Sequence, residues 1–171
     1  MAINIRPMTE EDKLSIMQVL RNTLEFKPSE LVVAEELIDS YLGAPCRSGY
    51  HILVGELNSV VAGYICFGPT ALTDATWDLY WMAVAPDKQG HGIGSALLKS
   101  AEENIREADG RLAIIETSSI PAYENTRHFH IRHGYETVAR VPDFYAPGDD
   151  KLILRRQLRS YQEKREAKHR G

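Results

Sequence analysis

Three glycines between a strand pattern and a helix pattern constrain this chain more than any other feature. The segment reads Val84-Ala-Pro-Asp-Lys-Gln-Gly-His-Gly-Ile-Gly-Ser-Ala-Leu-Leu98, and we call residues 89–95 the glycine loop. Glycine adopts backbone angles that other residues avoid, and it has no Cβ to obstruct a ligand. The backbone N–H groups of such a loop can converge beside the positive end of a helix. The segment is therefore predicted to cradle a diphosphate.

Three known phosphate-binding loops have related spacing, and this segment departs from each of them. A dinucleotide-binding turn has G-x-G-x-x-G, but Ser95 stands where the third glycine belongs. A P-loop closes with Gly-Lys-Ser/Thr, and no lysine follows Gly94. A kinase glycine loop requires H-R-D and D-F-G later in the chain, and neither occurs. What remains is Q-x-x-G-x-G, which begins at Gln89 after a strand that ends M-A-V-x-P.

This pattern resembles the coenzyme A loop of the GCN5-related N-acetyltransferases (GNAT), whose signature is Arg/Gln-x-x-Gly-x-Gly/Ala. The resemblance implies acetyl-CoA as co-substrate, and in the family the end of the preceding strand bonds the pantetheine arm. The implied cofactor-binding residues are Met82, Ala83, Val84, Gln89, Gly90, His91, Gly92, Ile93, Gly94 and Ser95. Gln89 replaces the arginine of many relatives, so backbone amides must carry more of the diphosphate binding. Lys88, Lys99 and Arg127 remain open as partners for the outer phosphate.

Hydrophobic periodicity predicts the elements around the loop. Strands are expected over 3–6, 50–57, 60–67, 76–85, 112–117, 135–141 and 151–158, and Asn58-Ser59 signals a hairpin. Helices are expected after Thr9, with an apolar stripe at Leu14, Met17, Leu20 and Leu24, and over 28–42, 95–108 and 122–133. This order is similar to GNAT over almost the whole chain. It implies an α/β fold whose mixed sheet is flanked by helices and splayed between its fourth and fifth strands.

Length and composition set further expectations. With 171 residues, the chain is expected to form one domain over 1–158, followed by a charged tail over 159–171. The net charge of −4 argues against nucleic acid as a partner, and no apolar run approaches the length of a membrane span. The first residues lack a signal-peptide pattern, and the two cysteines are too few for a disulfide framework. A cytoplasmic protein with reduced thiols is the default, and Cys66, inside an apolar run, is predicted to be a core residue.

Acetyl transfer to an amine needs the amine in its neutral form, and two carboxylates are candidates for a general base. Asp78 falls where histone-type GNAT members place a catalytic glutamate, although it can simply start the strand. Glu116 closes an apolar strand and can lie at the mouth of the site, or it can form a salt bridge. A proton relay through water is the third alternative.

The general acid depends on one departure from the family. GNAT members carry N-x-x-A-x-x-Φ-Y-x-x-x-G-F/Y after the fifth strand, and here His130 replaces the tyrosine that faces the sulfur. An imidazole can donate a proton near neutral pH, so His130 is a candidate acid. Tyr123, which replaces the family asparagine, and Tyr145 are the alternatives. His128, His130 and His133 do not predict a metal site, because only the last two share a helix face.

Aromatic residues near these positions are candidates for the acceptor site: Trp77, Tyr80 and Tyr145. The segment D-F-Y-A-P-G-D-D over 143–150 is similar to a stretch found in one GNAT subgroup. Its Asp149 and Asp150 can hold an ammonium group or can form a tight turn, and the turn is the favoured interpretation.

The function predicted is transfer of an acetyl group to a primary amine by direct attack in a ternary complex. The acceptor is left open between a small-molecule amine and a protein N-terminus or lysine, and the oligomeric state between monomer and homodimer. A coenzyme A-binding sensor with little turnover is the alternative function. A protein that keeps only the fold for interactions is a third.

Overall fold

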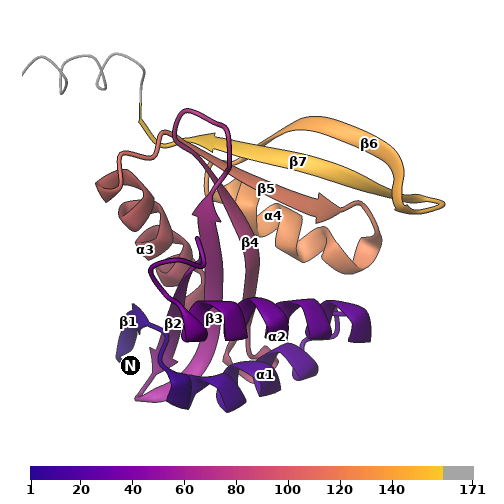
Figure 1. The fold of residues 1–171 in the computed structure, drawn as a ribbon. Helices are drawn as coiled ribbons and strands as arrows, with labels where there is room; N and C mark the ends of the chain where they lie inside the picture. The colour runs from indigo at the N-terminus through magenta and orange to yellow at the C-terminus, as the bar shows by residue number, and fades with distance from the viewer. Residues whose placement is uncertain (160–171) are drawn as a thin grey trace, which may run out of the picture. The chain divides into compact units, whose positions relative to one another are not determined.

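The computed structural model describes residues 1–159, and its elements follow the predicted order (Figure 1). Apart from Arg159, the predicted tail lies outside the described residues. Backbone contacts divide the chain into two units. The first combines Met1–Pro69 with Leu79–Ala101, and the second combines Thr70–Asp78 with the chain from Glu102 onward. The single domain over 1–158 stays a prediction. In residues 1–159, no helix is long and apolar enough to cross a membrane.

An antiparallel set of strands forms the frame of the first unit. β1 (Ile3–Pro7) pairs with β2 (His51–Leu57), which pairs with β3 (Val60–Pro69). The β2–β3 turn is the predicted one: Asn58 and Ser59 both have positive φ, at 50° and 66°. Two consecutive positive φ values are typical of the tight hairpin turn whose twist matches that of the strands, so the hairpin prediction is confirmed.

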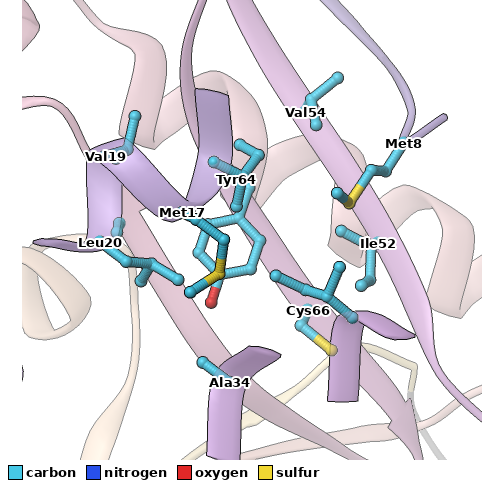
Figure 2. Close-up of a cluster of buried hydrophobic side chains, with 12 residues drawn as sticks. Met8, Met17, Val19, Leu20, Ala34, Ile52, Val54, Tyr64 and Cys66 are labelled. Carbon is cyan, nitrogen blue, oxygen red and sulfur yellow. The ribbon is translucent and has the colours of Figure 1, made fainter. Parts of the chain in front are cut away.

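Two helices supply the apolar core of the first unit. A 3₁₀ turn, η1 (Glu10–Asp12), leads into α1 (Lys13–Asn22), and α2 (Pro28–Gly43) follows. Met17 and Leu20 of α1 pack with Tyr64 and Cys66 of β3, as Figure 2 shows. Burial raises the pKa of the Cys66 thiol, as expected of a core residue.

The predicted stripe of α1 was wrong in part. Leu14 is 82% exposed and Leu24 is 100% exposed, whereas Ile16 and Val19 are buried beside the predicted Met17 and Leu20. The physical reason is that α1 ends at Asn22, so Leu24 lies beyond the helix, and Leu14 lies on its outer side.

The start of α3 (Ile93–Glu107) approaches the strands of the first unit through two glycines. A Cβ built on Gly55 of β2 would lie 2.9 Å from Ile93 Cγ2 and 3.3 Å from Leu97 Cγ. A Cβ on Gly63 of β3 would lie 3.3 Å from Leu97 Cδ1 and 2.7 Å from the Ala83 carbonyl oxygen. Glycine at 55 therefore permits the close approach of α3, and glycine at 63 permits the close approach of the β4 backbone.

The second unit contains the remaining strands. β4 (Thr76–Val84) and β5 (Leu112–Ser118) both begin in this unit. The Arg111 N–H donates to the Ala75 carbonyl at 2.9 Å, so the two strands start side by side and run parallel. β7 (Asp149–Gln157) pairs antiparallel with both β5 and β6 (Glu136–Ala146). Within residues 1–159, hydrogen bonding gives one mixed sheet in the order β1-β2-β3-β4-β5-β7-β6. The α/β class is confirmed.

The last hairpin corrects the predicted strand ends. The segment 143–150 was expected to join two strands, but β6 continues to Ala146 and β7 begins at Asp149. Pro142 interrupts the pattern in the sequence, yet the strand continues because the pairing skips from Val141 to Ala146. Residues 142–145 form a bulge, in which a residue without an N–H is tolerated.

A buried ionic cluster joins Glu102 of α3 to Arg156 of β7 and to Tyr135, the residue before β6. Glu102 is 3% exposed, and its oxygens accept from Arg156 Nη1 at 2.9 and 2.7 Å and from the Tyr135 hydroxyl at 3.0 Å. A buried carboxylate needs such partners, because an unpaired buried charge strongly destabilises the folded protein. We call this group the Glu102 cluster.

Candidate functional site

The glycine loop links the end of β4 to α3 in the first unit. A 3₁₀ turn, η2 (Pro86–Lys88), precedes it. Gly90 and Gly92 have φ of 77° and 85°, a region that side-chain-bearing residues rarely adopt. A Cβ on Gly90 would meet no atom within 4 Å, so the space beside this backbone is open. Glycine is therefore needed at 90 and 92 because of the backbone conformation at these two positions.

The N-terminus of α3 adds donors to the loop. The Ala96 N–H donates to the Gly92 carbonyl at 3.0 Å, which makes Ala96 the first residue bonded in the helical pattern. The N–H groups of the preceding first turn have no acceptor within a helix, and the helix dipole makes this end positive. These residues are Ile93, Gly94 and Ser95. The arrangement fits a diphosphate, since phosphate oxygens accept hydrogen bonds and carry negative charge.

The polar side chains of the loop bond to its own backbone. Gln89 Nε2 donates to the carbonyl of Val84, the last residue of β4, at 3.2 Å. His91 Nδ1 lies 3.1 Å from the Lys88 carbonyl oxygen and 2.9 Å from the Gln89 carbonyl oxygen. Lys88, one of the open phosphate partners, forms an ion pair with Asp87 at 3.0 Å.

β4 carries a one-residue bulge. The Thr70 N–H bonds the Thr76 carbonyl, and the Ala85 N–H bonds the Ala62 carbonyl. Eight residue steps separate Ala62 from Thr70 on the β3 side, and nine separate Thr76 from Ala85 on the β4 side, so the β4 side has one extra residue between the two bonds. The bulge interrupts simple alternation along the strand that contributes Met82, Ala83 and Val84 to the predicted cofactor site.

Each predicted base already has a partner. Asp78 of β4 is half-buried, and its Oδ2 accepts from the Thr70 hydroxyl at 2.6 Å. Glu116 of β5 is exposed and forms an ion pair with Lys151 of β7, with 2.7 Å between Nζ and Oε2. The Lys151 ammonium also lies 3.8 Å from the centroid of the Phe144 ring. The sequence analysis did not identify Thr70 or Lys151 as partners of these carboxylates. Lys151 lies two positions along β7 from the residue that pairs with Glu116, and such diagonal cross-strand neighbours are within reach of long side chains.

His130 lies in the interior of the second unit, on α4 (Glu124–Arg132). It is 4% exposed, and its Nδ1 has no hydrogen-bond partner among the described residues. Burial, with a smaller contribution from His133, lowers the pKa of His130 to about 4. The imidazole is therefore neutral at pH 7. Tyr123, the alternative acid, ends the 3₁₀ turn η3 (Pro121–Tyr123) and is half-buried.

The predicted acceptor residues differ in exposure. Trp77 is 6% exposed and packs on Gly110, where an added Cβ would lie 2.8 Å from its Nε1. Tyr80 is 39% exposed and contacts the Tyr50 ring edge-on, with 5.5 Å between centroids. Tyr145 is 45% exposed in the bulge of β6. Exposure leaves Tyr80 and Tyr145 available to a ligand, whereas Trp77 is a packing residue of its unit.

The two aspartates after the turn are occupied by the chain itself. Asp149 accepts from the Ser118 hydroxyl. Asp150 accepts from Arg140 and from the Asp143 N–H at 2.8 Å, and this backbone bond and Arg140 lower the pKa of Asp150. These bonds agree with the favoured interpretation of the segment as a turn rather than an ammonium site.

Two further placements bear on ligands. Arg127, another open phosphate partner, donates to the carbonyls of Ser118 and Ile120 at 2.7 and 2.9 Å. In the part of the chain that the structure describes, no group of three or more His, Cys, Asp or Glu side chains could hold a metal ion.

Comparisons with known proteins agree with the loop and the fold. The family model described as acetyltransferase (GNAT) domain matches residues 48–137. A crystal structure of a GNAT-family protein from Desulfovibrio desulfuricans has a TM-score of 0.89 and 40% identity, and covers 92% of this chain and 100% of that one. The yncA protein of Salmonella typhimurium, at 22% identity and a TM-score of 0.76, covers 94% and 96% and shares the fold.

Sequence relatives match over a shorter segment. The L-amino acid N-acyltransferase MnaT of Escherichia coli is 30% identical over 105 residues, which is 60% of each chain. The matched segment spans about 60% of the length of the curated relatives. Because the family model matches more than half of its residues, the chain belongs to the GNAT acetyltransferase family.

Proposed function

We propose that the protein is an acetyl-CoA-dependent N-acetyltransferase that moves an acetyl group to a primary amine. The glycine loop carries this proposal, because its positive φ values and its place at the N-terminus of α3 suit the diphosphate of coenzyme A. Family membership supports the same donor, and the yncA structure contains acetyl-CoA. Direct attack in a ternary complex is the proposed route, and Cys66, which is 0% exposed, is not accessible as an acyl-carrying nucleophile.

Coenzyme A would be held by backbone groups. The N–H groups of the glycine loop and of Ile93–Ser95 would take the diphosphate, and the end of β4 would take the amides of the pantetheine arm. Acetyl-CoA supplies an activated thioester, which the amine attacks to form an amide and release the coenzyme A thiol. The oxyanion of the tetrahedral intermediate needs an N–H donor, which we assign to the backbone of the bulged β4.

Proton transfer is assigned by elimination among the candidates. The ion pair with Lys151 makes Glu116 a less suitable base than Asp78, which Thr70 orients with a single hydrogen bond. A neutral His130 is a weak proton donor, so Tyr123 and Tyr145 are the better candidates to protonate the leaving thiolate. We retain the unpartnered Nδ1 of His130 as a hydrogen-bonding group that a bound ligand could satisfy.

The acceptor is proposed as an alkylamine, either on a small molecule or at a protein N-terminus or lysine. Tyr80 and Tyr145 are the proposed contacts for its apolar part. MnaT is described as acting on L-amino acids, which makes amino acids the first acceptors to test. The cytoplasm remains the proposed compartment, and monomer and homodimer remain alternatives.

Calorimetry with coenzyme A, followed by thiol release with a panel of amines, tests this function. The expected result is micromolar binding and amine-dependent thiol release. Binding without release from any amine would favour the coenzyme A sensor. No binding at millimolar coenzyme A would overturn the central claim and favour a protein that keeps only the fold.

A further inference from the structure

The side chain of His91 makes two contacts that the loop signature does not explain. The signature requires glycine at 92 and glycine or alanine at 94, and it leaves position 91 unspecified. Yet His91 Nδ1 lies within hydrogen-bond distance of two carbonyl oxygens, those of Lys88 and Gln89, at 3.1 and 2.9 Å. The side chain is exposed, so packing does not hold it in this position.

The chemistry of the two partners fixes the tautomer of the ring. A carbonyl oxygen can only accept a hydrogen bond, so Nδ1 must donate. Nδ1 therefore carries the proton in the neutral ring, and one N–H is shared between two acceptors. The opposite ring nitrogen, Nε2, then has a free lone pair.

Peptide geometry transmits this bond to the N–H groups of the loop. A peptide unit is planar and trans, so its N–H points opposite to its C=O. Fixing the Lys88 carbonyl orients the Gln89 N–H, and fixing the Gln89 carbonyl orients the Gly90 N–H. Both N–H groups must then point away from the imidazole ring.

The same bonds remove an unfavourable interaction. A carbonyl oxygen that turned toward a diphosphate would repel it, because both carry negative charge. Gly90 permits such a turn, since glycine has access to both signs of φ. The imidazole restricts this freedom by holding the two carbonyls.

We propose that His91 is a positioning residue, which orients the Gln89 and Gly90 N–H groups toward the diphosphate by holding two carbonyls with its Nδ1–H. The inference deepens the proposed function, because it assumes that the loop binds coenzyme A. His91 does not touch the reacting atoms. Its effect should therefore appear in the binding of the donor and not in the chemical step.

Three variants test the proposal. His91→Ala removes the donor, and His91→Asn keeps an N–H near the Nδ1 position. His128→Ala is the matched control, because His128 is exposed on α4, away from the loop in the chain. We expect the Kd for coenzyme A and the KM for acetyl-CoA to rise about tenfold in His91→Ala, while kcat stays within about twofold. His91→Asn and His128→Ala should stay within about twofold of the wild type.

Nitrogen-15 spectra of the ring supply a readout that is independent of activity. We expect the wild-type protein without ligand to show His91 with its proton on Nδ1. A proton on Nε2 instead, or His91→Ala binding coenzyme A as tightly as the wild type, would overturn the proposal. An equal loss in His91→Asn and His91→Ala would also overturn it. If the wild type itself failed to bind coenzyme A, the proposed function would fail, while the spectrum would still report whether the local bonds form.

Discussion

The glycine loop of the first unit and the polar interior of the second unit use hydrogen bonds in opposite ways. In the loop, Gln89 and His91 bond backbone carbonyls, and the N–H groups of the first turn of α3 lie outside the hydrogen-bond pattern of the helix itself. In the second unit, buried carboxylates such as Glu102 and Asp150 have their oxygens bonded within the chain. The first arrangement suits a ligand and the second suits stability. Substitutions should therefore separate binding from folding.

The largest expected effect is on stability, in the Glu102 cluster. Glu102→Ala leaves Arg156 without its carboxylate and should lower the free energy of unfolding by about 3 kcal/mol. Urea denaturation measures this loss. Glu107→Ala, at the exposed end of the same helix, should change it by less than about 0.5 kcal/mol.

Binding of coenzyme A by the folded Glu102→Ala protein tests whether this loss of stability is separate from the binding of the donor. Its Kd should stay within about twofold of the wild type, because the cluster belongs to the second unit. Tyr135→Phe, which removes one hydrogen bond, should cost about 1 kcal/mol and keeps the prediction testable if Glu102→Ala does not fold. A tenfold loss of affinity with unchanged stability would reverse the assignment of roles.

The next effect is on affinity, in the glycine loop. Gly92→Val places a β-branched residue at φ 85° and should weaken coenzyme A binding about 100-fold in calorimetry, equivalent to about 2.7 kcal/mol. Gly148→Val is the matched control, with φ 81° at the tip of the last hairpin and no neighbour within 4 Å. Both variants should lose similar stability, about 1–2 kcal/mol. Only Gly92→Val should lose affinity, and equal loss in both would contradict the prediction.

A third effect depends on pH and concerns His130. The unfolded histidine binds a proton near pH 6.5, whereas the buried side chain has a pKa of about 4. Its contribution to stability is therefore complete above about pH 6.5 and is lost as the pH falls toward 4. His130→Phe removes this dependence, so its stability should fall less between pH 7 and pH 4.5 than that of the wild type, by about 2 kcal/mol.

Enzyme kinetics test the role of His130 separately. If Tyr123 or Tyr145 supplies the proton, then His130→Phe and His130→Tyr should keep the pH profile of kcat between pH 6 and 8. A profile that loses an inflection near pH 6.5 in both variants would restore His130 as the acid.

The smallest effect concerns Asp12, a buried carboxylate of the first unit. Hydrogen bonding to Arg6 lowers its pKa to about 2. This contribution is present above about pH 4 and is lost as the pH falls from 4 to 2. Asp12→Asn should therefore lower the free energy of unfolding at pH 7 and make it depend less on pH between 4 and 2. The loss at pH 7 should be only about 1 kcal/mol, because Arg6 is partly solvent-exposed and the ion pair is screened. An unchanged pH dependence in this range would contradict this role of Asp12.

Local rules made the loop and the first hairpin predictable from sequence. Positive φ at Asn58 and Ser59, and glycine at 90 and 92, follow from short-range sterics. The last hairpin was less predictable, because its strand continues past Pro142 only where Asp150, eight residues later, bonds the bulge at Asp143. A bond to a residue on the opposite strand leaves no periodic signal.

The roles of individual polar residues were the least predictable part of the candidate site. Sequence placed Asp78, Glu116 and His130 at positions with the right chemistry, but their partners come from other elements: Thr70 for Asp78 and Lys151 for Glu116. Burial of His130 likewise depends on packing within its unit. A carboxylate and its neighbours must both be known before its protonation can be argued.

The two glycines under α3 have a consequence for protein engineering. A methyl group at Gly55 would lie too close to Ile93 in the first turn of α3, and one at Gly63 would lie too close to the Ala83 carbonyl near the end of β4, so these neighbours would have to shift. An anion-binding site tolerates little displacement of its donors. Mutant libraries designed to change the preference for the acyl donor should therefore keep both glycines, because a substitution there would displace residues that support the binding site.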